Sequence, residues 1–123
     1  MTDADRKLLE QADAVAGRAY APYSKFFVGA AVRTKDGRVF EGVNVENAAY
    51  PLGVCAEKTA LARAVSEGVK PGEVEALAVT ASPCGGCRQW LHEFAVERVI
   101  YRRANGDVTV ATPAELLPDT FEV

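Results

Sequence analysis

The chain has 123 residues, the usual size of one domain, and 49% of them are hydrophobic while 25% are charged. This balance is typical of a globular protein and excludes a disordered chain or a fibrous repeat. The net charge is −3 at pH 7, whereas proteins that grip polynucleotides or anionic membranes usually carry a basic excess. We therefore expect no polynucleotide and no membrane as a partner, and no apolar run approaches the ~18 residues of a membrane-spanning helix.

The N-terminal residues Met1–Asp5 are acidic and lack an apolar stretch, so we expect no secretory signal and a cytoplasmic protein. Three cysteines are an odd number, which makes disulfides a poor guess and a metal or catalytic role a better one. Because no repeat, low-complexity segment or linker interrupts the sequence, we interpret residues 1–123 as a single domain.

The predicted elements begin with an amphipathic helix over about residues 3–19, with Thr2 and Asp5 as a capping box. Two β-prone runs, residues 27–32 and 39–45, flank an Asp-Gly pair and indicate a hairpin. Residues 46–53 are expected to form a loop. Three further helices each have a cap or turn residue at one end: residues 55–67 before Gly68, residues 82–94 opened by Ser82-Pro83, and a short helix after Thr112.

Three more strands are predicted over residues 74–80, 99–102 and 108–111. Helices and strands thus alternate in the order α-β-β-α-β-α-β-β-α, which predicts one sheet covered by helices.

Two short motifs carry the chemistry, Cys55-Ala56-Glu57 and Pro83-Cys84-Gly85-Gly86-Cys87. A Cys-x-x-Cys turn can present two sulfurs to one zinc ion, and a third cysteine at another predicted helix start strengthens the signal. Helix N-termini favour anions and so help to hold thiolates. Three protein ligands leave a fourth position open for water, whose pKa zinc lowers, as in catalytic zinc sites.

These motifs match the zinc deaminase pattern of Cys, one residue, Glu, and then Pro-Cys-x-x-Cys. The chain resembles the small cytidine deaminases over essentially its whole length, and its three-cysteine form resembles their homotetrameric branch. The further segments that carry the resemblance are Tyr20–Phe26, Val28–Ala31, Asn44–Asn47, Ser82–Gln89 and Glu115–Pro118 with Phe121. The resemblance implies a three-layer α/β/α sandwich with a five-stranded mixed sheet, in which both zinc-bearing helices pack on one face.

The resemblance also implies a role for each site residue. The metal ligands would be Cys55, Cys84 and Cys87, holding one Zn²⁺ per subunit, and Glu57 would carry protons from the attacking water to the ring nitrogen and the leaving amine. The substrate-binding residues would be Asn44 and Glu46 at the ribose hydroxyls, Phe26 against the pyrimidine, backbone groups of Ala56 at the base edge, and Tyr50 and Phe121 at a neighbouring subunit's site. The expected reaction is hydrolytic deamination of cytidine and 2′-deoxycytidine in pyrimidine salvage, by a homotetramer with shared active sites.

The sequence departs from the family pattern in two places. Lys58 stands where the family usually has Arg. In the family, that Arg and the one matching Arg88 donate to the cysteine sulfurs, and Lys keeps the charge without the planar donor fork. The connection Thr80-Ala81-Ser82 is shorter than is usual in the family, which predicts a lost pocket wall or a lost part of a subunit contact.

Several alternatives stay open at this point. The three cysteines could be small buried hydrophobes, or His92, the only histidine, could close a structural zinc site. A non-catalytic zinc module would bind metal without deaminating anything. The zinc motifs also fit a deaminase of an aminonucleoside antibiotic or of a modified cytidine. The segment Asn44–Asn47 argues against this, because a ribose reader is expected for plain nucleosides.

Overall fold

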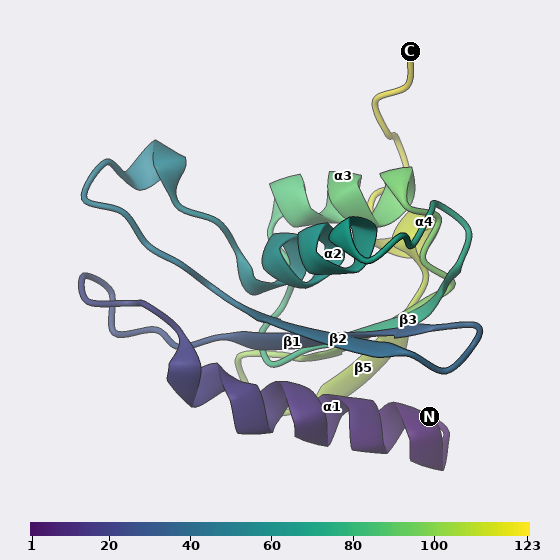
Figure 1. Ribbon diagram of the computed structural model, residues 1–123, viewed down its shortest axis with the longest axis horizontal. Coiled ribbons are helices and arrows are strands. Elements are labelled where there is room, and N and C mark those ends of the chain that lie inside the picture. The colour runs from purple at the N-terminus through teal and green to yellow at the C-terminus, as the bar shows by residue number, and fades with distance from the viewer.

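The computed structural model describes residues 1–123 as a five-stranded sheet between two layers of helices (Figure 1). The elements in chain order are α1 (Asp3–Val15), β1 (Gly29–Thr34), β2 (Val39–Val43), α2 (Ala56–Ser66), β3 (Val74–Val79), α3 (Gly85–Glu93), β4 (Arg98–Arg102), β5 (Val108–Ala111) and α4 (Pro113–Leu116). Short 3₁₀ helices follow α1 at Ala16–Arg18 and precede α2 at Tyr50–Leu52. The predicted order of elements is confirmed. None of the helices has the length and apolar character that crossing a membrane requires.

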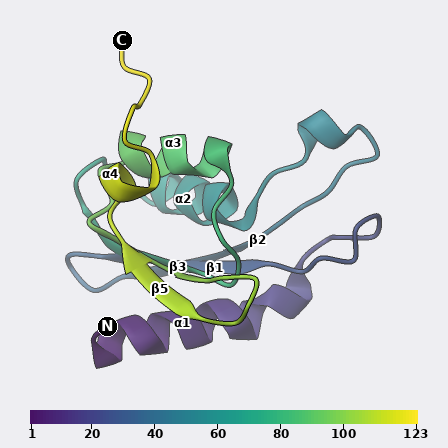
Figure 2. The same ribbon diagram turned by 180° about the vertical axis from the view of Figure 1, so that it is seen from behind.

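The sheet is mixed, with the strand order β2-β1-β3-β4-β5. Only β3 and β4 run parallel, and α3 makes the crossover between them. The other neighbours are antiparallel. Helix α1 covers one face, and α2 and α3 lie together on the other (Figures 1 and 2). This confirms the three-layer α/β/α sandwich and the shared face of the two cysteine-bearing helices.

The two faces of the sheet bury separate sets of side chains, because successive strand residues point in opposite directions. On the α1 side the buried set is small and rich in alanine: Leu8, Leu9, Ala12, Ala31, Ala76, Ala78 and Ile100. On the α2 side the set is larger and includes Val32, Leu61, Leu77, Val79 and Leu91. Both helix layers are therefore fixed by apolar burial against one rigid sheet.

Two glycines set how closely the helices approach the sheet. A Cβ at Gly29 would lie 2.0 Å from the carbonyl oxygen of Ala12 in α1. A Cβ at Gly42 would lie 2.3 Å from the backbone nitrogen of Ala60 in α2. Because Cys55 and Glu57 stand at the start of α2, the contact at Gly42 helps to set the height of the site residues above the sheet.

Several predicted boundaries are wrong by two or more residues, and the structure shows the reasons. The strand predicted at residues 27–32 starts at Gly29, because the side chain of Asn44 binds the backbone at Phe26 and Val28. The first helix ends at Val15 and tightens into a 3₁₀ turn. The third helix begins at Gly85 with Cys84, and not Ser82, as its N-cap.

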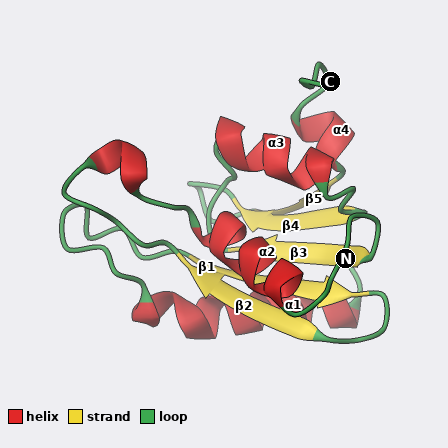
Figure 3. Cartoon of the chain, turned by 45° about the horizontal axis from the view of Figure 1, so that its top comes forward, coloured by secondary structure: helices red, strands yellow, loops and turns green.

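Two segments between helices and strands extend past the end of the sheet, as Figure 3 shows. They are residues 19–28 and residues 44–55. An isolated bridge between Tyr20 and Val45 joins the two segments, and a second, between Val45 and Val54, lies within residues 44–55. These paired segments and the start of α2 surround the candidate site.

Candidate active site and metal centre

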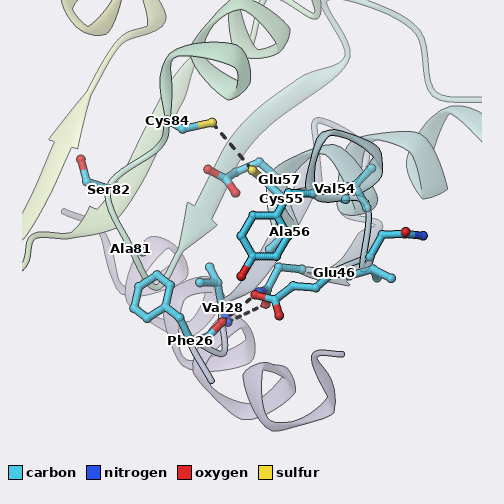
Figure 4. Close-up of a pocket in the computed structure, with 15 residues that line it drawn as sticks. Phe26, Val28, Glu46, Val54, Cys55, Ala56, Glu57, Ala81, Ser82 and Cys84 are labelled. Carbon is cyan, nitrogen blue, oxygen red and sulfur yellow. Dashed lines mark hydrogen bonds between the residues drawn. The ribbon is translucent and has the colours of Figure 1, made fainter. Parts of the chain in front are cut away.

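A cavity of about 350 Å³ lies at this end of the sheet (Figure 4). Its lining comes from the two extended segments, from the first turn of α2, and from the connection between β3 and α3. The predicted site residues that line it are Phe26, Asn44, Glu46, Tyr50, Cys55, Ala56, Glu57 and Cys84. Ala81 and Ser82, from the short connection, also contribute to the lining. Residues far apart in the sequence thus converge on one cavity.

The three cysteines form a cluster with the dimensions of a zinc site. All three sulfurs lie within 4.8 Å of one another, and the Sγ atoms of Cys55 and Cys84 are 3.7 Å apart. Thiolates at ~2.3 Å from a tetrahedral zinc ion lie about 3.8 Å from each other. Cys55 and Cys84 are the N-caps of α2 and α3, and Cys87 is buried in the first turn of α3. The residues present therefore fit one zinc ion with three protein ligands.

The cluster favours a thiolate even before a metal binds. A hydrogen bond from Cys87 lowers the pKa of Cys55 to about 6, although burial opposes the shift. A bond from Cys84 and the charge of Lys58 lower it further. The backbone N–H of Cys87 also donates to the Sγ of Cys84, at 3.4 Å. Thiolate is the form that binds zinc, so the site is prepared for the ion.

Lys58 lies where a cation can act on the cluster. A Cβ at Gly86, which lies between Cys84 and Cys87 in the sequence, would be 3.3 Å from the Nζ atom of Lys58. The ammonium group of Lys58 therefore lies over the first turn of α3. Arg88, by contrast, donates from Nε to the carbonyl oxygen of Pro83 and from Nη1 to that of Leu116, both at 2.9 Å. Its implied bond to a cysteine sulfur stays a prediction, while the observed bonds hold the Cys84 turn and α4 in place.

Glu57 is the buried acid of the site. Its side chain is 4% exposed and lines the cavity with Cys55 and Cys84, and Figure 4 shows the carboxylate next to the two sulfurs. Burial raises the pKa of Glu57 to about 7, and the charge of Cys55 adds to the effect. A divalent cation at the cysteines would in turn favour the ionised form. Glu57 is therefore placed and tuned to exchange a proton near neutrality.

Glu46 lies at the other end of the cavity from the cysteines, as Figure 4 shows. Asn44 also lines the cavity, and both side chains organise the segment that carries Phe26. The amide of Asn44 accepts from the Val28 N–H and donates to the Phe26 carbonyl, both at 2.8 Å. Asn44 is thus a structural clamp as well as a candidate ligand.

The carboxylate of Glu46 accepts bonds from the backbone N–H groups of Tyr23 and Ser24, at 3.0 and 3.1 Å, and from the Ser24 hydroxyl. The bond from that hydroxyl is the main reason that the pKa of Glu46 is lowered. The Ser24 oxygen accepts in turn from the Phe26 N–H, at 3.0 Å. Ser24 lies within the Tyr20–Phe26 segment, but no pattern in the sequence pointed to this role.

The two aromatic residues expected at a neighbouring subunit's site lie apart. Tyr50 lines this chain's own cavity and contacts Tyr23 edge to face, with ring centroids 6.1 Å apart. Phe121 lies outside the cavity lining, in the C-terminal tail beside α3. His92 is near the same tail, with Nε2 3.1 Å from a Glu122 carboxylate oxygen, and the potential metal-binding group consists of the cysteines alone.

A three-thiolate centre, an adjacent buried glutamate and an apolar cavity in an α/β/α sandwich define the class of zinc-dependent deaminases. The family model described as "Cytidine and deoxycytidylate deaminase zinc-binding region" matches residues 2–103. The chain therefore belongs to this family.

Individual relatives agree with the family assignment. A cytidine deaminase from Halalkalibacterium halodurans is 46% identical over 95% of this chain and 94% of its own. The 1.6 Å crystal structure of cytidine deaminase from Burkholderia pseudomallei superimposes with a TM-score of 0.89 at 47% identity, covering 98% of this chain and all of that one. A blasticidin-S deaminase from Bacillus cereus is 34% identical over 77% of this chain and 76% of its own.

Proposed function

We propose that this chain catalyses the hydrolytic deamination of cytidine and 2′-deoxycytidine. Water adds an oxygen to C4 of the pyrimidine, the C4–N bond breaks, and uridine or 2′-deoxyuridine and ammonia leave. The main supporting observation is the cavity, which is lined by two members of the three-cysteine cluster, by the buried Glu57, and by Asn44 and Glu46. We propose that residues 1–123 act as one catalytic domain, working in pyrimidine salvage.

Zinc, when bound by the three cysteines, supplies Lewis-acid activation of the attacking water. Glu57 accepts a proton from this water and delivers protons to the ring nitrogen and to the leaving amine. Its burial beside the cluster keeps bulk water from competing for these protons. The backbone of Ala56, at the first turn of α2, binds the base edge, and Phe26 packs against the pyrimidine ring.

The charge of the cavity favours a neutral nucleoside over a nucleotide. Its lining contains two carboxylates, those of Glu46 and Glu57, and no Lys, Arg or His side chain. A substrate phosphate would meet no cation there, and it would be repelled by the Glu46 carboxylate if it lay near it. A carboxylate and an amide can both bind a sugar diol, which supports ribose hydroxyls as the groups that Glu46 and Asn44 recognise.

The test is a spectrophotometric deamination assay on cytidine, 2′-deoxycytidine, cytidine 5′-monophosphate and blasticidin S. We expect turnover of the two nucleosides, loss of turnover after zinc removal, and recovery when zinc is added back. Preferential turnover of the antibiotic would favour the alternative substrate class instead. Bound zinc without turnover of any of these compounds would indicate a non-catalytic zinc module.

The active form that we propose is a homotetramer with shared sites, located in the cytoplasm. Large aromatic side chains support shared sites, because Phe26 and Tyr50 line the cavity but are 61% and 66% exposed in the single chain, and Phe121 is 74% exposed. Free thiols at all three cysteines suit a reducing compartment. Sedimentation velocity of the active protein should give a tetramer, and a fully active monomer would contradict the shared sites.

A further inference from the structure

Gln89, in α3, holds the backbone of the C-terminal tail at Phe121. The Nε2 group of Gln89 donates to the carbonyl oxygen of Phe121 at 3.0 Å, and the N–H of Phe121 donates to Oε1 of Gln89 at 3.2 Å. One side-chain amide therefore satisfies both backbone polar groups of Phe121, as a neighbouring strand would. This pair of bonds fixes the residue in position and in orientation.

The same helix holds the metal ligands. Cys87 lies in the first turn of α3 and Cys84 caps it, so Gln89 ties the tail directly to the cysteine cluster's own helix. Two neighbouring bonds support the attachment: Arg88 donates to the Leu116 carbonyl at 2.9 Å, and His92 pairs with Glu122 at 3.1 Å. In Figures 1 and 2 the tail passes α3 and continues away from the sheet.

The tail is held by its backbone, while the ring of Phe121 stays exposed. Chain ends usually fray unless they are tied down, yet this end is tied down while its largest apolar side chain is 74% exposed. The backbone bonds contribute no apolar burial to the chain itself. Holding an exposed aromatic ring at a defined position is useful if another molecule receives it, because a pre-ordered side chain loses less entropy on contact.

We propose that Gln89 is a positioning residue, whose amide presents the Phe121 ring to the nucleoside cavity of a second copy of this chain. The inference rests on the proposed homotetramer with shared sites. Gln89 does not touch the substrate in this arrangement and acts only through Phe121. Its removal then lets the tail fray and reduces the fraction of time that the ring completes the neighbouring cavity.

The experiment compares Gln89→Ala, Phe121→Ala and the double variant, with Gln11→Ala as the matched control, which removes an exposed glutamine from α1 on the opposite face of the sheet. For Gln89→Ala we expect KM for cytidine to rise about 5- to 10-fold with little change in kcat, since two hydrogen bonds to the tail are lost. Gln89→Glu keeps the acceptor and loses the donor, so its KM should be intermediate. Gln11→Ala should keep the parent KM. Thermal unfolding and sedimentation velocity establish that each variant is folded and tetrameric.

The double variant separates the possible failures. If Gln89 acts only through Phe121, adding Gln89→Ala to Phe121→Ala should raise KM no further. A full additional increase, or a normal KM in Gln89→Ala when Phe121→Ala raises it, would overturn the positioning role while the shared site stands. A normal KM in Phe121→Ala would instead remove Phe121 from the shared site, and with it the basis of the inference. Dissociation of Gln89→Ala but not of Phe121→Ala would show that Gln89 acts on assembly and not on the ring.

Discussion

Negative charge is the main electrostatic problem at the level of single residues. Three thiolates around Zn²⁺ leave one excess negative charge, and the Glu57 carboxylate stands next to them. No cationic side chain lines the cavity, so the compensating positive charge has to come from the side of the sulfurs that faces away from the cavity. Lys58 lies there, over the first turn of α3, and it contributes to lowering the pKa of Cys55.

Replacing Lys58 therefore tests charge compensation. We expect Lys58→Ala to weaken zinc binding about 10- to 100-fold, the usual cost of losing a partner of a zinc ligand. Lys58→Arg should bind zinc at least as well as the parent, because the charge is kept and donors are added. Competition with a zinc chelator measures both. Lys7→Ala, which removes an exposed ammonium from α1 on the opposite face, is the matched control, and an equal affinity in Lys58→Ala and this control would contradict the role.

Glu57 is expected to matter for turnover and not for metal retention. Glu57→Gln keeps the shape of the side chain but cannot accept and return the proton, so kcat for cytidine should fall at least about 100-fold. Zinc content by elemental analysis should stay at one ion per chain. Glu67→Gln, an exposed change at the other end of α2, is the control and should retain the parent kcat. Near-normal kcat in zinc-loaded Glu57→Gln would refute the proton-transfer role.

At the level of elements, the site depends on how α2 and α3 are seated on one face of the sheet. Both helices have a cysteine as their N-cap, and the cysteine cluster forms where the two N-termini meet. The position of α2 on the sheet is closely fixed, because the backbone of Gly42 in β2 packs directly against the backbone of Ala56 and Ala60 in α2. A shift of α2 would move Cys55 and Glu57 together, relative to the other two cysteines.

Gly42→Ala is the smallest change that tests this seating. Its Cβ would lie 2.3 Å from the Ala60 nitrogen and 2.8 Å from the Ala56 carbonyl oxygen, and neither atom can rotate away. We expect the free energy of unfolding to fall by about 3 kcal/mol or more, the upper end for overpacking, with weaker zinc binding. Thermal unfolding and chelator competition give the two readouts. Gly17→Ala, where a Cβ meets nothing within 4 Å, should change neither.

At the level of the whole molecule, a buried ion cluster joins α1 to strands β1 and β4 on the sheet face that α1 covers. Asp5 is 1% exposed and pairs with Arg33 of β1 and Arg98 of β4, at 2.8 and 2.9 Å. Glu75 completes the cluster through a 2.9 Å bond to Arg33. Burial alone would raise the pKa of Asp5, but the hydrogen bonds from Arg98 and Arg33 outweigh burial and hold it well below its ordinary value of 3.8.

This cluster predicts how the protein responds to acid. Because the pKa of Asp5 is lower in the folded chain, its contribution is complete above about pH 4 and is lost as the pH falls toward the folded pKa. Asp5→Asn should cost about 3 kcal/mol of unfolding free energy at pH 7, since Arg33 and Arg98 both lose the Asp5 carboxylate and keep only Glu75 near them. The difference from the parent should shrink between pH 4 and pH 2. Urea unfolding across this range checks it, with the exposed Asp3→Asn as control; a pH-independent difference would contradict the assignment.

Many features of this protein could be predicted from interactions between residues that are close in the sequence. The metal ligands, the glutamate, the capping boxes at Thr2 and Thr112 and the order of elements follow from short-range patterns, because caps, turns and alternation act within a few residues. The resemblance added the nucleoside-binding residues, whose roles stay predictions; of these, Phe26, Asn44 and Glu46 line one cavity.

Long-range packing accounts for what the linear pattern missed. Helix spacing places Glu57 and Cys55 on diverging faces, and only the packing of α2 against the sheet and α3 brings Glu57 beside two cysteines. The start of α3 at Gly85 depends on a sulfur cap, and the bonds of Ser24 to Glu46 and of Gln89 to Phe121 join residues 22 and 32 positions apart. Such contacts form only when distant segments of the chain meet in the folded structure, so patterns of neighbouring residues cannot predict them.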